Sequence, residues 1–110
     1  MELDIRGRNV SLTDPLAHLV RRRLDFALGR HASEIRRVEV KLADVNGPRG
    51  GVDKECRVEV VLSHGGSVAA HGIDEHVRNA IDRAAHRAGR RVNRKLARVA
   101  NSRRGERLSA

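Results

Sequence analysis

Hydrophobic and polar residues alternate in four stretches of the chain, and this period of two predicts four β-strands. In the first stretch, residues 3–10, Leu3 and Ile5 share one face. Residues 36–45 and 55–62 show the same pattern, with apolar positions at Val38, Val40 and Leu42, and at Cys56, Val58, Val60 and Leu62. Residues 67–73 follow the turn sequence SHGG and predict a shorter strand. Since only one face of each strand is apolar, the sheet should cover a core on one side.

Two other segments have apolar residues at steps of three and four, which is the period of a helix. Thr13 or Asp14 can cap the first helix, Pro15 suits its first turn, and Gly29 can end it. Its apolar positions are Leu16, Leu19, Val20, Leu24 and Ala27. Asp74 is a candidate cap for the second helix, whose apolar positions are Val77, Ala80, Ile81, Ala84, Ala85, Ala88, Val92 and Leu96. Gly89 interrupts this stripe, at a cost of about 1 kcal/mol relative to Ala.

The resulting order, β-α-β-β-β-α, predicts an α+β fold in which one four-stranded sheet carries both helices on a single face. A chain of 110 residues fits one domain. We assign residues 1–98 to that domain and residues 99–110, which lack periodicity, to a flexible basic tail. Phe26 is the one aromatic residue, so the core should be aliphatic.

The charge balance narrows the choice of partner. The chain has 23 Lys and Arg against 14 Asp and Glu, a formal net charge of +9. Such an excess favours a nucleic acid, an acidic protein or a membrane surface. No apolar run approaches the roughly 20 residues of a membrane span, and the N-terminus has no apolar signal segment, so we expect a cytoplasmic protein. Cys56 is the only cysteine, which excludes an internal disulfide and a cysteine cluster for zinc.

The second predicted helix has an unbroken basic flank. At 100° per residue, six arginines fall on one side: Arg83, Arg87, Arg90, Arg91, Arg94 and Arg98. No acidic residue occurs between positions 83 and 100. Like charges on a solvated helix repel, so this pattern favours an RNA surface over a merely exposed helix, which remains the alternative. Four arginines of the first helix would extend the patch if the helices lie side by side: Arg21, Arg22, Arg23 and Arg30.

The type of nucleic acid follows from what the chain lacks. Binders of single strands stack bases on aromatic rings, and one phenylalanine makes that mode improbable. A DNA-reading helix-turn-helix needs two helices joined by a short turn, whereas three predicted strands separate these. Arginines that contact phosphates and the shape of folded RNA fit better.

Catalysis has little support in the sequence. His71 and His76 are five residues apart, and no H-E-x-x-H pair occurs among the six histidines. Ser11, Ser63 and Ser67 lack the sequence context of a catalytic nucleophile. We therefore predict no enzyme activity, no metal, no cofactor and no small-molecule substrate, and keep a metal-dependent hydrolase as the alternative.

The glycine-rich segment NGPRGG raises the question of a phosphate-binding loop. It lacks the G-K-[ST] of such a loop, and a strand follows it rather than a helix. A hairpin connection is favoured, with Asp44 and Asp53 as turn residues. Arg49 and Lys54 are then auxiliary RNA contacts.

Three segments carry a family resemblance: GRNVSLTDPL, VEVKLADVNGPRGGVDKECRVEVVL and AIDRAAHRAGRRVNRKL. They resemble the bacterial ribosome hibernation promoting factors, also called ribosome-associated inhibitors or the YfiA-like family. The most specific part is N-G-P-[RK]-G-G-x-D-K-x-C-R. The resemblance implies a fold like that of double-stranded-RNA-binding domains. It also implies binding to the small (30S) ribosomal subunit and its 16S rRNA, which would block the channel for messenger and transfer RNA during stress or stationary phase.

The family's basic residues on both helices make its rRNA contacts. By position that role falls on Arg22 and Arg23, and on Arg83, Arg87, Arg90, Arg91 and Arg94. Arg30, Lys95 and Arg98 complete the predicted interface. The resemblance also implies a short form, monomeric alone, without the C-terminal dimerisation domain of long members. A general binder of double-stranded or structured RNA, without ribosome preference, is the alternative.

Overall fold

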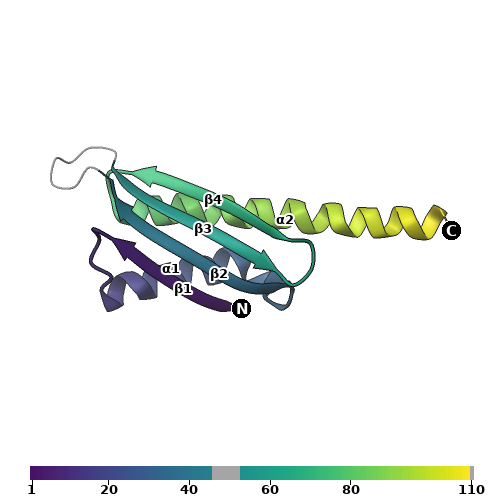
Figure 1. Ribbon diagram of the computed structural model, residues 1–110, viewed down its shortest axis with the longest axis horizontal. Coiled ribbons are helices and arrows are strands. Elements are labelled where there is room, and N and C mark those ends of the chain that lie inside the picture. The colour runs from purple at the N-terminus through teal and green to yellow at the C-terminus, as the bar shows by residue number, and fades with distance from the viewer. Residues whose placement is uncertain (46–52, 110) are drawn as a thin grey trace.

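The computed structural model describes residues 1–45 and 53–109, with side chains described through residue 101 (Figure 1). The predicted β-α-β-β-β-α order is confirmed, with one added 3-10 helix, η1. The elements are β1 (Glu2–Arg8), α1 (Asp14–Leu28), η1 (Gly29–Glu34), β2 (Ile35–Asp44), β3 (Lys54–Leu62), β4 (Ser67–Asp74) and α2 (Val77–Ser109). None of these described helices combines the length and apolar character needed to cross a membrane.

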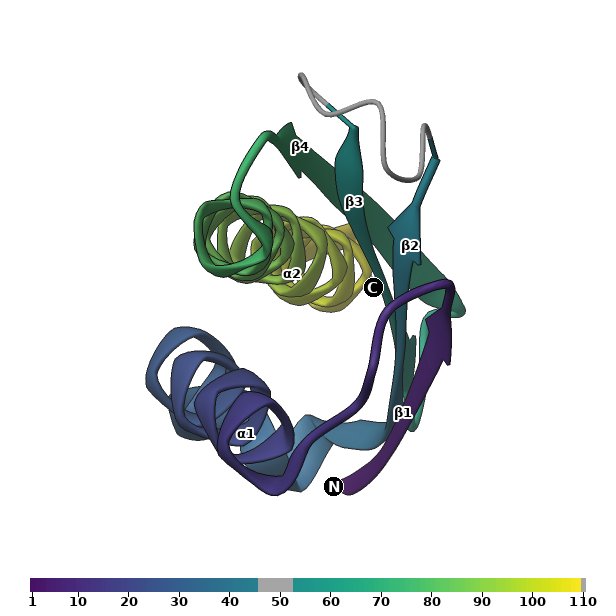
Figure 2. The ribbon, with the colours of Figure 1, turned by 90° about the vertical axis from the view of Figure 1, so that its left-hand side faces the viewer.

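The four strands form one mixed sheet in the order β1-β2-β3-β4. β1 runs parallel to β2, while β2–β3 and β3–β4 are antiparallel pairs. Both helices lie on the same face of this sheet, side by side (Figure 2). α2 packs on β3 and β4, and α1 packs against α2. The predicted α+β architecture is therefore confirmed.

The core is aliphatic and lies between the sheet and the helices. The inward positions predicted for β2 and β3 are buried, whereas Leu3 and Ile5 of β1 are partly buried against the core. The β2–β3 register sets Val40 opposite Val58. α1 contributes Val20, Leu24 and Leu28, and α2 contributes a mostly small stripe of Ala80, Ile81, Ala84, Ala85, Ala88 and Val92. Phe26 lies outside this core, with 93% of its surface exposed. The one aromatic ring of the chain therefore adds nothing to core packing.

The ends of α1 answer two questions that the sequence left open. The Thr13 side chain accepts a hydrogen bond from the Leu16 N–H (3.3 Å), so Thr13, not Asp14, is the cap. Gly29 follows the last residue of the helix, but its φ of −57° is right-handed. The chain can therefore turn directly into η1 without the left-handed glycine cap.

α2 begins after an entry turn held by Asp74. One Asp74 oxygen accepts hydrogen bonds from the His76 N–H (3.0 Å) and the Asn79 amide (3.3 Å), although the helix itself starts at Val77. The helix then continues without a break to Ser109, beyond the predicted boundary at residue 98. Flexibility of residues 99–110 stays a prediction.

Gly89 does not break α2, and the packing of the helices explains why glycine stands there. A Cβ at this position would lie 2.9 Å from the backbone oxygen of Ala27 and 3.3 Å from its Cβ. The glycine thus allows α1 to approach α2 closely at Ala27. Glycine lowers the stability of the helix by about 1 kcal/mol relative to alanine, and the close packing of the two helices that it permits offsets this cost.

The antiparallel pairing of β2 with β3 extends to the pair Asp44–Lys54. The NGPRGG segment therefore connects neighbouring antiparallel strands, as predicted for a hairpin. Its residues, 46–51, and with them Arg49, lie outside the described residues.

Candidate RNA interface

The six arginines predicted on one side of α2 are all exposed, and we call them the arginine flank: Arg83, Arg87, Arg90, Arg91, Arg94 and Arg98. Small residues on the opposite side of the helix bring its axis close to the sheet. The flank therefore faces away from the core, and it extends from the α1 side of the helix to the edge of β4. Lys95, also predicted, is only half-exposed.

Two arginines of the flank contact the outer edge of the sheet. Arg87 donates a hydrogen bond from Nη1 to the backbone oxygen of His71 (2.8 Å), and Arg91 donates one to the backbone oxygen of Ala69. Both acceptors belong to β4, the edge strand. Backbone carbonyls are neutral, so both guanidinium groups keep their full charge while their positions are fixed. The same contacts cover an otherwise open strand edge.

The remaining arginines of the flank differ in whether a carboxylate side chain offsets their positive charge. Arg83 pairs with Asp74 (Nη2–Oδ2, 3.4 Å), an exposed contact of small energetic value. The hydrogen bond from the His76 backbone, with help from Asn79 and Arg83, lowers the pKa of Asp74 below its usual value of 3.8. Within residues 1–45 and 53–101, Arg90, Arg94 and Arg98 have no ion-pair or hydrogen-bond partner. These three guanidinium groups are free to contact phosphates.

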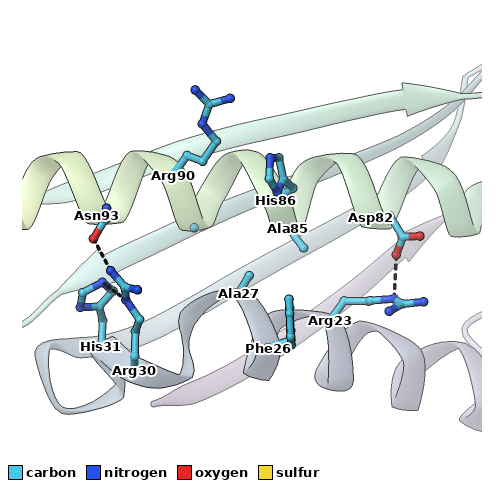
Figure 3. Close-up of a pocket in the computed structure, with 11 residues that line it drawn as sticks. Arg23, Phe26, Ala27, Arg30, His31, Asp82, Ala85, His86, Arg90 and Asn93 are labelled. Carbon is cyan, nitrogen blue, oxygen red and sulfur yellow. Dashed lines mark hydrogen bonds and ion pairs between the residues drawn. The ribbon is translucent and has the colours of Figure 1, made fainter.

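The α1 arginines join this surface through contacts between the helices (Figure 3). Arg23 forms an ion pair with Asp82 of α2 (Nε–Oδ1, 2.8 Å). Seven residues further along, in η1, Arg30 donates a hydrogen bond to the Asn93 side chain (2.8 Å). Because the Asn93 amide is neutral, Arg30 keeps its charge, whereas Asp82 offsets that of Arg23. Asp82 and Asn93 were not among the predicted site residues, since pairing between helices cannot be read from either helix alone.

Arg22 lies at the other end of the helix pair, where a shallow depression separates α1 from the start of α2. It shares this depression with Leu19, Val77 and Arg78. Arg78 is exposed and was not predicted as a site residue. Its spacing of five from Arg83 turns it about 140° away from that residue on the helix, so the pattern of the arginine flank could not have indicated it.

The face of the sheet that points away from the helices carries charges of both signs and serves as a comparison for the helix face. There, arginines pair with carboxylates on the same strand: Arg6 with Asp4 (3.4 Å), Arg37 with Glu39 (3.3 Å) and Arg57 with Glu55 (2.7 Å). Charges of both signs alternate and cancel. The helix face concentrates positive charge instead, and this segregation is the electrostatic signature of an anion-binding surface.

Lys54, a predicted auxiliary contact, is held at the base of the β2–β3 hairpin. Its Nζ lies 3.2 Å from Asp44 Oδ2 and 3.0 Å from Oδ1 of the buried Asp53. The hydrogen bond to Asp53, assisted by Asp44, raises the pKa of Lys54. The lysine thus lies between two carboxylates, which leaves little of its charge for an RNA phosphate.

The cysteine and histidines show no constellation typical of catalysis. Cys56 is buried, and desolvation raises the pKa of its thiol to about 12, so it is a neutral core residue at physiological pH. In the described part of the chain, no three His, Cys, Asp or Glu side chains are placed to hold a metal ion.

Comparison with known proteins adds a family and a fold. The model of the family described as "Sigma 54 modulation protein / S30EA ribosomal protein" matches residues 3–100. A ribosomal subunit interface protein from Coxiella burnetii has a similar structure, with a TM-score of 0.72 and 17% identity over 88% of this chain and 99% of that one. The Protein Y N-terminal domain from Thermus thermophilus gives a TM-score of 0.70 and 26% identity over 86% of this chain and 98% of that one. No curated protein matches the chain.

Proposed function

The chain belongs to the family of sigma 54 modulation proteins and S30EA ribosomal proteins, and from this membership we propose that it is a ribosome hibernation factor. It binds the small ribosomal subunit through the arginines of α1 and α2. It inhibits translation by filling the channel that messenger RNA and transfer RNA otherwise occupy. The observation that carries this proposal is the segregation of charge: unpaired arginines on the helix face, and paired charges on the sheet face.

The known relatives support a ribosomal partner. The Coxiella burnetii neighbour is named a ribosomal subunit interface protein, and both neighbours are matched over nearly their whole length. The structure supports inhibition by binding alone, without a catalysed reaction. Guanidinium groups bind phosphates as planar forks with several donors, and a rigid helix pair holds them in place. Occupying space is then sufficient for inhibition, and no bond needs to be made or broken.

A general module for structured RNA is the second candidate. It is favoured by the nature of the flank, because arginines that contact phosphates carry no information about base sequence. Competition between purified small subunits and bulk duplex RNA separates the two candidates. A hibernation factor should prefer the subunit at equal nucleotide concentration, and a general module should not.

The decisive experiment reverses the three unpaired charges. Arg90→Glu, Arg94→Glu and Arg98→Glu together should abolish co-sedimentation with small subunits, while circular dichroism stays that of the folded protein. For the unaltered chain, contact with about six phosphates predicts that log affinity falls against log salt with a slope of about −4 to −5.

The matched control makes the same change in net charge on the sheet face. Arg6→Glu, Arg8→Glu and Lys41→Glu together should leave co-sedimentation largely intact, because these residues lie on β1 and β2, away from the helices. Equal loss from both triple variants would show that only net charge matters. Unchanged binding by the flank variant would refute the proposed surface.

A further inference from the structure

An open groove between α1 and α2 combines positive charge with the only phenylalanine of the protein (Figure 3). Its volume is about 520 Å³, within the range of about 300–1,000 Å³ typical of small-ligand sites. Phe26 and Arg23 lie on its α1 side, and His86 and Arg90 on its α2 side. Gly89 and Ala27 form part of the lining at the crossing point, where neither side chain fills the space.

Phe26 is placed unusually for a residue of its kind. It is 93% exposed, although burial of a phenylalanine typically contributes about 1.5–3 kcal/mol. On the helical wheel it lies off the apolar stripe, toward the arginines of α1. A single exposed apolar residue needs no explanation by itself. This one, however, stands at the rim of a cationic groove on the proposed RNA surface.

Two arginines on the same side of the groove as Phe26 are held by partners on α2. Arg23 lies one helical turn before Phe26 and Arg30 lies four residues after it, in η1, and their bonds to Asp82 and Asn93 fix both side chains. Arg30 keeps its charge, and Arg90 on the α2 side of the groove has no partner in the described part of the chain, although its guanidinium group points away from α1 (Figure 3). An aromatic face flanked by guanidinium groups is the arrangement that holds an unstacked base and its phosphates.

We propose that Phe26 is a stacking platform for one unpaired base of the RNA, and that the groove between α1 and α2 is a nucleotide-binding subsite. This inference rests on the proposed RNA-binding function and adds to it. The arginine flank contacts phosphates whatever the base sequence, whereas the groove requires a base that is bulged or looped out of a helix. The surface therefore selects RNA in which an unpaired nucleotide stands beside a folded backbone. Stacking at this one position adds to the phosphate contacts, and the chain is still not expected to be a general binder of single strands.

The test uses the full chain with two substitutions and small ribosomal subunits as the probe. Phe26→Leu keeps an apolar side chain but removes the ring, and it should weaken binding about 5- to 150-fold in sedimentation competition. Phe26→Trp keeps a ring and should bind like the unaltered protein. The chain has no other tryptophan. The indole emission of Phe26→Trp should therefore be quenched when the base stacks on it.

The control is Ile73→Ala, which removes a partly exposed apolar side chain from the sheet face and should leave affinity unchanged. Binding of Phe26→Leu equal to that of the unaltered chain would overturn the subsite, as would unquenched emission in a co-sedimenting Phe26→Trp protein. If the unaltered chain fails to bind subunits, the proposed function fails. A hairpin RNA with a one-base bulge, compared with its fully paired counterpart, then decides the subsite separately. Quenching only by the bulged hairpin supports stacking, and equal quenching refutes it.

Discussion

Replacing Gly72 by alanine should destabilise the protein by disturbing the contact between β4 and α2. A Cβ at Gly72 would lie 2.6 Å from the Ala80 oxygen, 2.7 Å from Arg83 Cβ and 2.8 Å from the Ala84 nitrogen. Ordinary contact begins at 3.4 Å, so the shortest of these separations must grow by about 0.8 Å (3.4 minus 2.6). All three atoms belong to the α2 backbone or are fixed directly to it. No side-chain rotation can relieve the clash, and the helix must shift as a body.

The expected cost follows from this geometry. Overpacking a well-packed core costs about 1–3 kcal/mol, and the smaller conformational freedom of alanine in the unfolded chain offsets only about 0.4–1 kcal/mol. The net cost is about 0.6–2 kcal/mol (1 minus 0.4, and 3 minus 1). For a domain of this size each kcal/mol lowers the Tm by roughly 4–8 °C, so we expect a drop of about 2–16 °C. A displaced α2 should also weaken the contacts of Arg87 and Arg83 with β4, and with them RNA affinity.

The measurement is thermal and urea unfolding followed by far-ultraviolet circular dichroism. Gly29→Ala is the matched control, because its φ is right-handed and a Cβ there would meet no atom within 4 Å. It should be neutral or slightly stabilising. A Gly72→Ala protein within about 0.5 kcal/mol of the unaltered chain, the range of ordinary surface changes, would refute the close-contact argument.

Three further outcomes are expected. Asp82→Asn should release Arg23 for a phosphate and steepen the slope of log affinity against log salt by about 0.7–0.9. The control Glu59→Gln, on the sheet face, should leave this slope unchanged. Identical slopes for the two variants would contradict the charge segregation. Cys56 should resist thiol reagents at pH 8 in the folded protein and react in guanidinium; fast labelling of folded protein would contradict its burial. Asp74→Asn should lower stability at neutral pH. Folding lowers the pKa of Asp74, so the stability that its carboxylate contributes is present above the usual pKa of 3.8 and is lost as the pH falls through the pKa of the folded state. The urea midpoints of Asp74→Asn and the unaltered protein should therefore converge in acid. A gap that stays constant with pH would argue against a role for the carboxylate.

Much of the fold could be predicted because its signals are local. Alternation identified the inward residues of β2 and β3, and the period of α2 identified its buried alanines. The predicted role of Gly89 was incomplete, because its neighbour at the crossing, Ala27, is more than sixty residues away in sequence. The roles of Gly72 and Asp53 were out of reach for the same reason. A glycine in a strand and an aspartate beside a turn are both common for local reasons. The sequence therefore gives no sign that Gly72 packs tightly on α2 or that the Asp53 carboxylate is buried.

The amino-acid sequence alone determined the order of the strands and the two long helices, the aliphatic core and the surplus of arginine, since each depends on residue type and spacing. Only the tertiary structure decided which charges remain unpaired. Asp82 offsets Arg23, and the β4 carbonyls fix Arg87 and Arg91 without neutralising them. It also decided that Phe26 stands in a groove with arginines from both helices. Electrostatic and packing energies depend on distances between residues remote in sequence, and folding alone sets those distances.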